Sequence, residues 1–222
     1  MLHDQTAPKN NDLWNSRLRL CILNASVLLF IQSGIASAAE TITQEGFEAN
    51  VVPPNNWTRV QNNPSYTWKI ATASGPHTGT YFADVEYDPA LVNQDEILLS
   101  PEFRAANATV SFYSKGSVYW CRDTYDNCDL EIWIVKGEWD GGTDNDLYVG
   151  KADDAWTGSF LWSLSSYNLD SLLPNSPIRI GFRYKGNDGA EVGLDDIEIR
   201  YTEPNFPWPM FMPSITNSGQ VQ

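Results

Sequence analysis

From Thr41 onward the chain consists of short apolar or alternating segments separated by Gly, Pro, Asn and Asp, and no long segment has helical periodicity. Alternating runs bounded by turn residues are typical of β-strands, because successive side chains of a strand point to opposite faces of its sheet. Ten segments have this character: 41–48, 66–70, 80–86, 96–100, 109–114, 130–136, 147–150, 158–164, 178–184 and 191–201. Many short strands of this kind pack as two layers, so the sequence predicts an all-β domain of two antiparallel sheets.

The alternation is clearest near the end of the chain, where Ile178, Ile180 and Phe182 share one face of a strand. The strand 130–136 alternates in the same way and carries Trp133 on its second face. A large aromatic side chain there is either covered by a loop or exposed for binding.

Residues 1–39 resemble an export signal, with Arg17 and Arg19 before the apolar run 20–31 and small residues at 36–39. The alternative is an uncleaved anchor, but the run is far shorter than the roughly 20 residues that span a membrane. We therefore expect a protein that is secreted or displayed at the cell surface, with no membrane insertion of the mature domain.

The predicted domain covers residues 40–201, and a Pro-rich tail follows over residues 202–222. The length and apolar content of the chain predict one folded domain of ordinary size, and we expect a monomer.

The charge balance is strongly acidic, with 14 Lys plus Arg against 28 Asp plus Glu and a formal net charge of -14. Nucleic-acid binding needs clustered basic residues, so this partner class is excluded. With two His and three Cys, the chain also lacks the residues for a thiolate zinc site and for most His-based catalysis.

Two cysteines, Cys121 and Cys128, lie in the mature part of the chain. In an oxidising compartment we expect them to form a disulfide that stabilises the fold by about 2 to 3 kcal/mol. The alternatives are two free thiols or a metal site, and the latter lacks further ligands nearby.

Seven segments, taken in order, resemble secreted modules of the MAM-like, cleaved-adhesin and choice-of-anchor J group. They are GFE (46–48), PNNW (54–57), DEILLSP (95–101), TVSFYS (109–114), LEIWI (130–134), IRIGFRY (178–184) and GLDDIEI (193–199). The resemblance implies a jelly-roll β-sandwich without catalytic activity, found in extracellular adhesins and beside secreted peptidases. In several relatives a calcium ion ties the first and last strands together.

The residues also favour a calcium site, because Ca²⁺ binds several oxygen ligands and neutralises carboxylates that repel one another. Glu48 ends the first predicted strand, Asp195 and Asp196 begin the last, and Asp84 lies on a middle strand. Alternation places Asp195 on the face of Ile197, in the core, where a carboxylate needs a partner. The alternative is that Asp195 caps a turn through backbone amides, with Asp196 in solvent.

An enzyme is not predicted. Asp129 and Glu131 alternate on one strand face as a hydrolase of the glycosidase type would require, but no third acidic residue follows at a suitable spacing. His77 lies in a Gly- and Pro-containing loop, where we expect a solvated side chain rather than a member of a catalytic triad.

Exposed tryptophans are the best candidates for ligand contacts. Trp120, Trp139 and Trp156 stand in predicted loops, where an aromatic side chain stacks on a sugar or anchors a protein interface; packing in the core is the alternative. We therefore expect a non-catalytic adhesion or ligand-binding module for an extracellular protein or cell-surface partner. A lectin-like, carbohydrate-binding module is the alternative.

Overall fold

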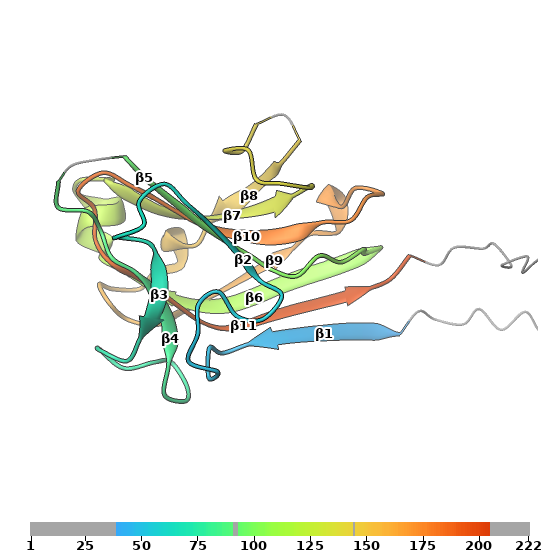
Figure 1. Cartoon of the computed structure of the whole chain (residues 1–222), viewed down its shortest axis with the longest axis horizontal. Coiled ribbons are helices and arrows are strands. Elements are labelled where there is room, and N and C mark those ends of the chain that lie inside the picture. The colour runs from blue at the N-terminus through green and yellow to red at the C-terminus, as the bar shows by residue number, and fades with distance from the viewer. Residues whose placement is uncertain (1–38, 91–92, 144, 205–222) are drawn as a thin grey trace, which may run out of the picture. The chain divides into compact units, whose positions relative to one another are not determined.

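The computed structural model describes residues 39–90, 93–143 and 145–204, so all but the last residue of the predicted signal peptide and most of the Pro-rich tail lie outside the described residues. These ranges contain eleven strands and three short helical turns (Figure 1). The strands are β1 (Glu40–Glu45), β2 (Thr58–Gln61), β3 (Trp68–Ala71), β4 (Phe82–Val85), β5 (Gln94–Leu99), β6 (Asn107–Lys115), β7 (Cys128–Val135), β8 (Leu147–Lys151), β9 (Ser163–Asn168), β10 (Arg179–Gly186) and β11 (Val192–Thr202). The helical turns are η1 (Tyr119–Asp123), η2 (Asp153–Ala155) and η3 (Asp170–Leu172).

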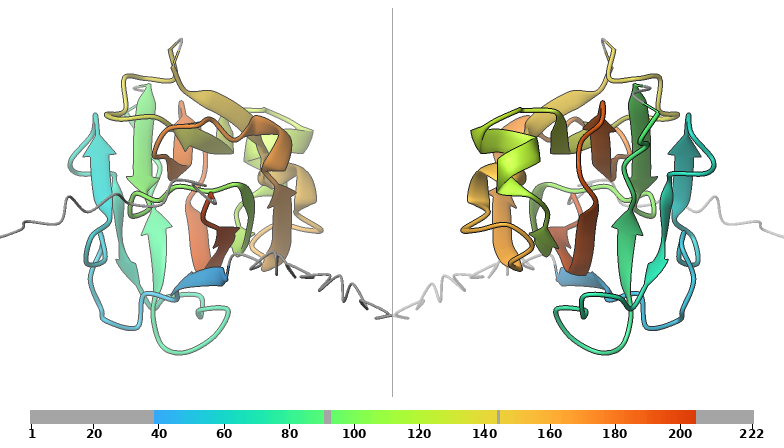
Figure 2. Two further views of the ribbon diagram at one scale, coloured as in Figure 1. Left: turned by 90° about the vertical axis from the view of Figure 1, so that its right-hand side faces the viewer. Right: turned by 90° about the vertical axis from the view of Figure 1, so that its left-hand side faces the viewer.

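The strands form two antiparallel sheets. Sheet A has the order β3-β4-β11-β6-β9, with β1 paired to the second half of β11, and sheet B has the order β2-β5-β10-β7-β8. The two sheets lie face to face as two layers (Figure 2). The predicted all-β, two-sheet antiparallel jelly-roll sandwich is confirmed.

The core lies between the sheets and is filled by the apolar residues that alternation predicts. Ile178, Ile180 and Phe182 are buried there, and Phe182 meets Phe112 of sheet A edge to face with 5.1 Å between ring centroids. Side chains of both inner faces interdigitate, which is the packing expected of a β-sandwich.

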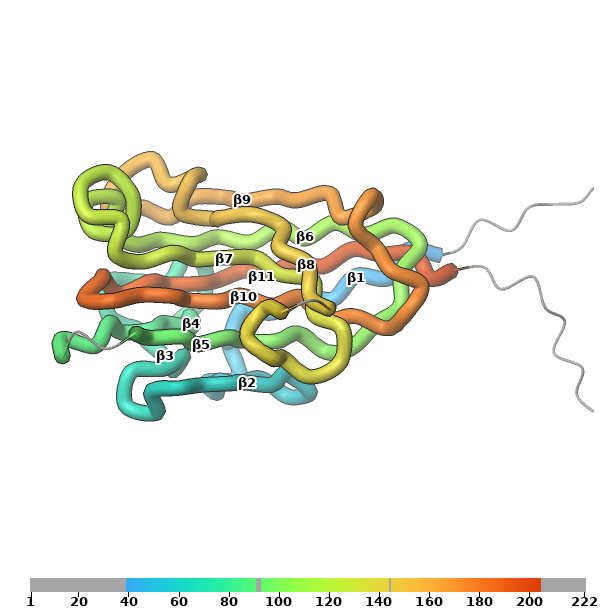
Figure 3. Tube along the Cα trace, turned by 90° about the horizontal axis from the view of Figure 1, so that it is seen from above, coloured from blue at the N-terminus to red at the C-terminus, as the bar shows by residue number. Residues whose placement is uncertain are grey.

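The outer face of sheet B is partly covered by the loop that joins β7 and β8, which crosses above β10 in Figure 3. Under this loop Ile97, Leu99 and Val135 form a small second cluster, and Trp133 and Trp139 pack against it. Trp133 is therefore a covered side chain rather than a free binding surface.

Three strands differ from the sequence prediction. Strand β1 ends at Glu45, so Glu48 lies in the turn that follows rather than at the end of the strand. Strand β2 was missed, because its four residues, TRVQ, are mostly polar and lie at the edge of sheet B. The predicted strand 158–164 overlaps β9 in two residues only, because the polar sequence of β9, SLSSYN, has weak apolar alternation. Edge strands bury little apolar surface, so the hydrophobic pattern predicts them poorly.

Strand β1 pairs with β11 from Glu40 opposite Thr202, so the described domain begins and ends on neighbouring strands. None of the helical turns in the described ranges is long and apolar enough to cross a membrane.

The tight packing of the second cluster yields a stability prediction. A Cβ at Gly181 would lie 2.7 Å from Ile97 Cδ1 and 3.3 Å from Val135 Cγ2. We expect Gly181→Ala to lower the free energy of unfolding by about 1 to 3 kcal/mol, as overpacking usually does, in urea denaturation. Lys185→Ala, at an exposed position of the same strand, is the control; equal stability of Gly181→Ala and the wild type would contradict the prediction.

Candidate functional site

Strand β11 is interrupted by a bulge at Asp195 and Asp196. The register with β6 shifts within this segment, and Asp196 has a φ of 47°. Asp195 pairs with Tyr113 on the outer face of sheet A, whereas Ile197 and Ile199 are buried in the core. The predicted core-facing direction of Asp195 was wrong, because a bulge reverses the alternation beyond it.

The loop between β3 and β4 binds this bulge. Asp195 Oδ2 accepts hydrogen bonds from the amides of His77, at 2.8 Å, and Thr78, at 3.3 Å. Asp196 interacts with His77 Nδ1 at 2.6 Å and accepts from Thr78 Oγ1 at 2.7 Å. The imidazole also stacks on Tyr113 with 3.4 Å between ring centroids. Asp195 therefore binds backbone amides as the alternative expected, but neither Asp196 nor His77 is simply solvated.

Glu48 binds the end of the same loop that leads into β4. Its Oε1 accepts hydrogen bonds from the amides of Thr80, at 2.8 Å, and Tyr81, at 3.0 Å. A Cβ at Gly79 would lie 2.2 Å from this oxygen, and the φ of Gly79 is +65°, so only glycine fits there. Three of the four predicted calcium ligands, Glu48, Asp195 and Asp196, thus converge on one loop.

These three carboxylates match calcium in the kind of donor they offer, because Ca²⁺ prefers hard oxygen ligands. Their placement does not match it. Among the described residues no three His, Cys, Asp or Glu side chains lie close enough to hold one ion. The oxygens instead accept hydrogen bonds from the β3–β4 loop, so calcium binding stays a prediction.

Asp84 lies apart from the other three. Strand β4 places it opposite Gly193 on sheet A, where it is 8 % exposed and lines a separate cavity of about 260 Å³. Burial, reinforced by the charges of Glu191 and Glu86, raises the pKa of Asp84 to about 7. The structure therefore does not bring Asp84 together with the other predicted calcium ligands.

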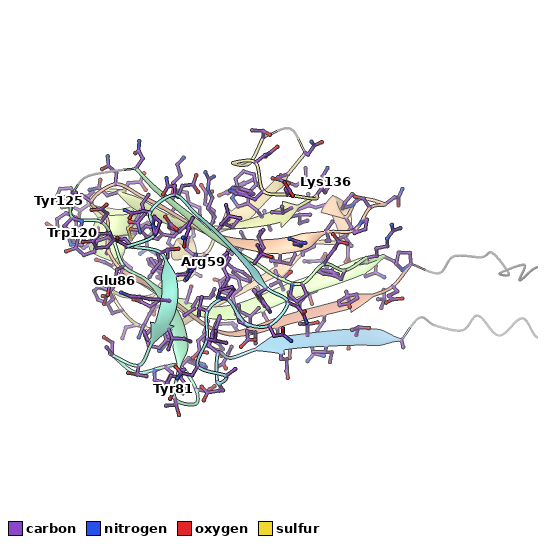
Figure 4. All side chains as sticks on the ribbon, viewed as in Figure 1. Arg59, Tyr81, Glu86, Trp120, Tyr125 and Lys136 are labelled. Carbon is purple, nitrogen blue, oxygen red and sulfur yellow. A yellow bond between two sulfur atoms is a disulfide. The ribbon has the colours of Figure 1, made fainter. Side chains whose placement is uncertain are left out.

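An exposed aromatic cluster forms at the loop between β6 and β7. Trp120 stacks on Tyr125 with 4.5 Å between ring centroids, and Tyr119 meets both rings edge-on. The predicted disulfide between Cys121 and Cys128 is confirmed and closes this loop. Figure 4 places Trp120 and Tyr125 side by side at one end of the sandwich.

The same end contains an aromatic cleft of about 220 Å³, formed by residues from four loops. Its aromatic walls are Tyr87, Trp120 and Phe160, each more than one-third exposed. Ser117, Asp188, Gly189, Ala190 and Glu191 complete the lining. Sequence reasoning identified only Trp120, since Tyr87 and Phe160 come from distant loops and no local pattern connects them.

Arg122 holds the β6–β7 loop, which carries the aromatic cluster, against the segment around η2. Its guanidinium donates hydrogen bonds to the carbonyls of Asp153, at 3.0 Å, and Trp156, at 2.9 Å. Trp156 is only 2 % exposed and donates through Nε1 to Ser114 Oγ at 2.9 Å. The prediction of Trp156 as a surface contact was wrong, because the segment after η2 turns its indole into the core.

Trp139 is half-buried over the small cluster of sheet B, where the Arg183 guanidinium lies 5.1 Å from its ring centroid. Its surroundings indicate a structural role more than a binding role.

The two predicted hydrolase carboxylates are held in ion pairs. Asp129 meets Lys151 Nζ at 2.5 Å, and Glu131 meets Arg183 at 3.1 Å. Both are on the outer face of sheet B, and each pairs with a neighbouring cation, as in a structural network.

Three buried carboxyl groups determine how stability depends on pH. Burial is the main cause that raises the pKa of Asp84 to about 7 and those of Asp153 and Asp195 to about 6. Between about pH 4 and pH 7 the folded chain therefore binds more protons than the unfolded chain, so stability decreases as the pH rises.

We expect the free energy of unfolding to be larger at pH 5 than at pH 7.5, by on the order of 2 kcal/mol, in chemical denaturation. Asp84→Asn should reduce this difference, because an amide does not ionise. Glu102→Gln, at an exposed position, should leave it unchanged. A free energy of unfolding that rises between pH 5 and pH 7.5 would refute the raised pKa values of these buried carboxyl groups.

No known protein-family model matches the chain, and no curated protein matches it. Among solved structures, the K2 cleaved adhesin domain of Lys-gingipain is 14% identical with a TM-score of 0.53, over 72% of this chain and 99% of that domain. The K1 cleaved adhesin domain of Lys-gingipain from Porphyromonas gingivalis W83 is 16% identical with a TM-score of 0.49, over 74% of this chain and 99% of that one.

The N-terminal CBM22-1-CBM22-2 tandem domain from Paenibacillus barcinonensis Xyn10C is 13% identical with a TM-score of 0.50, over 79% of this chain and 49% of that one. The chain thus spans about half the length of this tandem. At these identities the chain shares a β-sandwich fold with cleaved adhesin domains and carbohydrate-binding modules.

Proposed function

We propose that this chain is a secreted, non-catalytic module that binds a glycan in the aromatic cleft of Tyr87, Trp120 and Phe160. The observation that carries the proposal is the concave arrangement of three exposed aromatic rings beside polar acceptors at one end of the sandwich. Flat aromatic faces stack on sugar rings, while carboxylates and hydroxyls accept hydrogen bonds from sugar hydroxyls.

The structural matches support a binding role. One matched structure is a cleaved adhesin domain and another contains two carbohydrate-binding modules, and both share the sandwich fold with this chain. A secreted location further rests on the export signal expected in residues 1–39.

A protein partner is the second candidate. Tyr119, Tyr125 and Leu161 are exposed by 48 %, 49 % and 57 % close to the cleft. Contiguous exposed apolar side chains of this size are typical of protein interfaces. The cleft itself favours a glycan, because a protein interface needs a larger and flatter contact area than a cavity of about 220 Å³ offers.

Substitution of Trp120 tests the glycan proposal. We expect Trp120→Ala to weaken binding at least about tenfold in calorimetric titration with the strongest ligand from a glycan array, because the stacking surface is lost. Tyr148→Ala removes another exposed aromatic side chain, on β8 of sheet B, and should leave the affinity unchanged. If no glycan on the array binds and no soluble sugar changes the tryptophan fluorescence, the proposal of glycan binding is excluded.

We also propose that calcium stabilises the fold through Glu48, Asp195 and Asp196. In the structure the carboxylate oxygens of these residues accept hydrogen bonds from the β3–β4 loop. The support is their convergence on one loop, where Asp195 and Glu48 accept from backbone amides and only Asp196 contacts the imidazole of His77. A divalent cation would relieve the remaining repulsion.

If so, millimolar CaCl₂ should raise the melting temperature of chelator-treated protein by a few degrees, as ligand binding to the folded state requires. Asp196→Asn should remove this rise, and Asp84→Asn should retain it. The absence of both binding heat and a thermal shift with Ca²⁺ would refute the calcium proposal.

A further inference from the structure

A second cavity adjoins the aromatic cleft. It lies over the outer face of sheet A, has a volume of about 260 Å³ and is lined by Asp84, Lys115 and Phe82, among others. Phe160 and Glu191 line both this cavity and the aromatic cleft. A ligand long enough to leave the cleft along this wall would therefore reach the second cavity.

The cationic groups of the second cavity are already engaged by the protein. Lys69 Nζ pairs with Glu86 at 2.5 Å. Lys115 Nζ donates to the carbonyl of Gly75 at 2.9 Å and lies 4.3 Å from the ring centroid of Phe82. These donors are directed at chain acceptors, so the cavity offers a ligand few free hydrogen-bond donors.

In the part of the chain that the structure describes, two of its three carboxylates, those of Asp84 and Glu191, are in contrast free, whereas Glu86 is paired with Lys69. Asp84 is 8 % exposed and lines the cavity, and within the described ranges its carboxylate has no hydrogen-bond or ion-pair partner. Glu191, which lines both cavities, and Asp188, which lines the aromatic cleft, also have none for their side chains among the described residues. A buried carboxylate without a partner is unfavourable, so this position favours a ligand group that donates hydrogen bonds and carries positive charge.

We propose that the second cavity is a subsite for the ammonium group of an amino sugar, which makes the ligand an oligosaccharide that contains 2-amino sugars. One sugar ring stacks in the aromatic cleft, and the ammonium of a neighbouring unit binds Asp84 and Glu191. The ring of Phe160, shared by the two cavities, provides an aromatic wall that also attracts a cation. This assignment rests on the proposed glycan-binding function and specifies its ligand.

Calorimetric titration at about pH 7, near the raised pKa of Asp84, tests the assignment, because a bound ammonium group favours the ionised carboxyl group. The probes are the β-1,4-linked glucosamine tetramer, its fully N-acetylated counterpart and the glucose tetramer of the same linkage. We expect the glucosamine tetramer to bind at least about tenfold more tightly than the other two, as one charge-assisted hydrogen-bonded pair allows. Asp84→Asn should abolish this preference without weakening the neutral tetramers.

Glu102→Gln removes one acidic charge from an exposed position outside both cavities and should retain the preference. If Asp84→Asn does not fold, Glu191→Gln, at an exposed position, should reduce the preference instead. Equal affinities for all three tetramers, with binding lost in Trp120→Ala, would overturn the amino-sugar assignment and leave the glycan function intact. Binding of tetralysine that depends on Asp84, without binding of the glucosamine tetramer, would overturn the assignment in favour of a basic peptide. No binding of any sugar would refute the glycan function itself.

Discussion

The buried carboxylate of Asp195 is the interaction on which the outer face of sheet A depends. It is fully buried, and a carboxylate in that position is unfavourable unless donors surround it. The amides of His77 and Thr78 provide those donors, which holds the β3–β4 loop against the bulge of β11. Once the loop lies there, His77 stacks on Tyr113 and the carbonyl of Gly75 accepts from Lys115. The same contacts direct the amine of Lys115 away from ligands in the neighbouring cavity, so the chemistry of that cavity follows from how Asp195 is satisfied.

The layers of this fold could be predicted because each central strand buries one face. In β7 and β10 one face is apolar at every second residue, and the structure buries Leu130, Ile132, Ile134, Ile180 and Phe182 in the core as this pattern predicts. The same alternation did not predict strand β2 or the bounds of β9, because both strands lie at sheet edges. The direction of Asp195 was wrong for a different reason. The bulge depends on the backbone conformation of Asp196 and not on the order of polar and apolar residues, so apolar alternation does not predict it.

The residues of the candidate site could likewise be predicted only in part. Glu48, Asp195 and Asp196 could be grouped because they flank strands that the fold brings together, whereas Asp84 lies on the same sheet but opens into another cavity. Trp156 shows that a loop context does not establish exposure, since Arg122 draws its segment inward. The aromatic cleft combines four loops that are far apart in the sequence. Only the three-dimensional arrangement relates Tyr87 to Trp120, and a single sequence contains no signal for such a pairing.

The aromatic end of the domain is suited to binding because it is both fixed and accessible. The disulfide and the hydrogen bonds of Arg122 hold the loop of Trp120 on the sandwich, so little conformational entropy remains to be lost when a ligand is ordered there. Strands β1 and β11 place the beginning and end of the described domain at the opposite end, away from Trp120 and Tyr125 (Figures 1 and 4). A surface on this end can therefore meet an extended ligand without interference from the strands at which the domain begins and ends. The acidic surplus of the chain has a local consequence at the same place, since Asp84, Asp188 and Glu191 offer acceptors that no cation of the described chain neutralises by direct contact. Unpaired carboxylates of this kind disfavour anionic ligands and favour a ligand that brings its own positive charge.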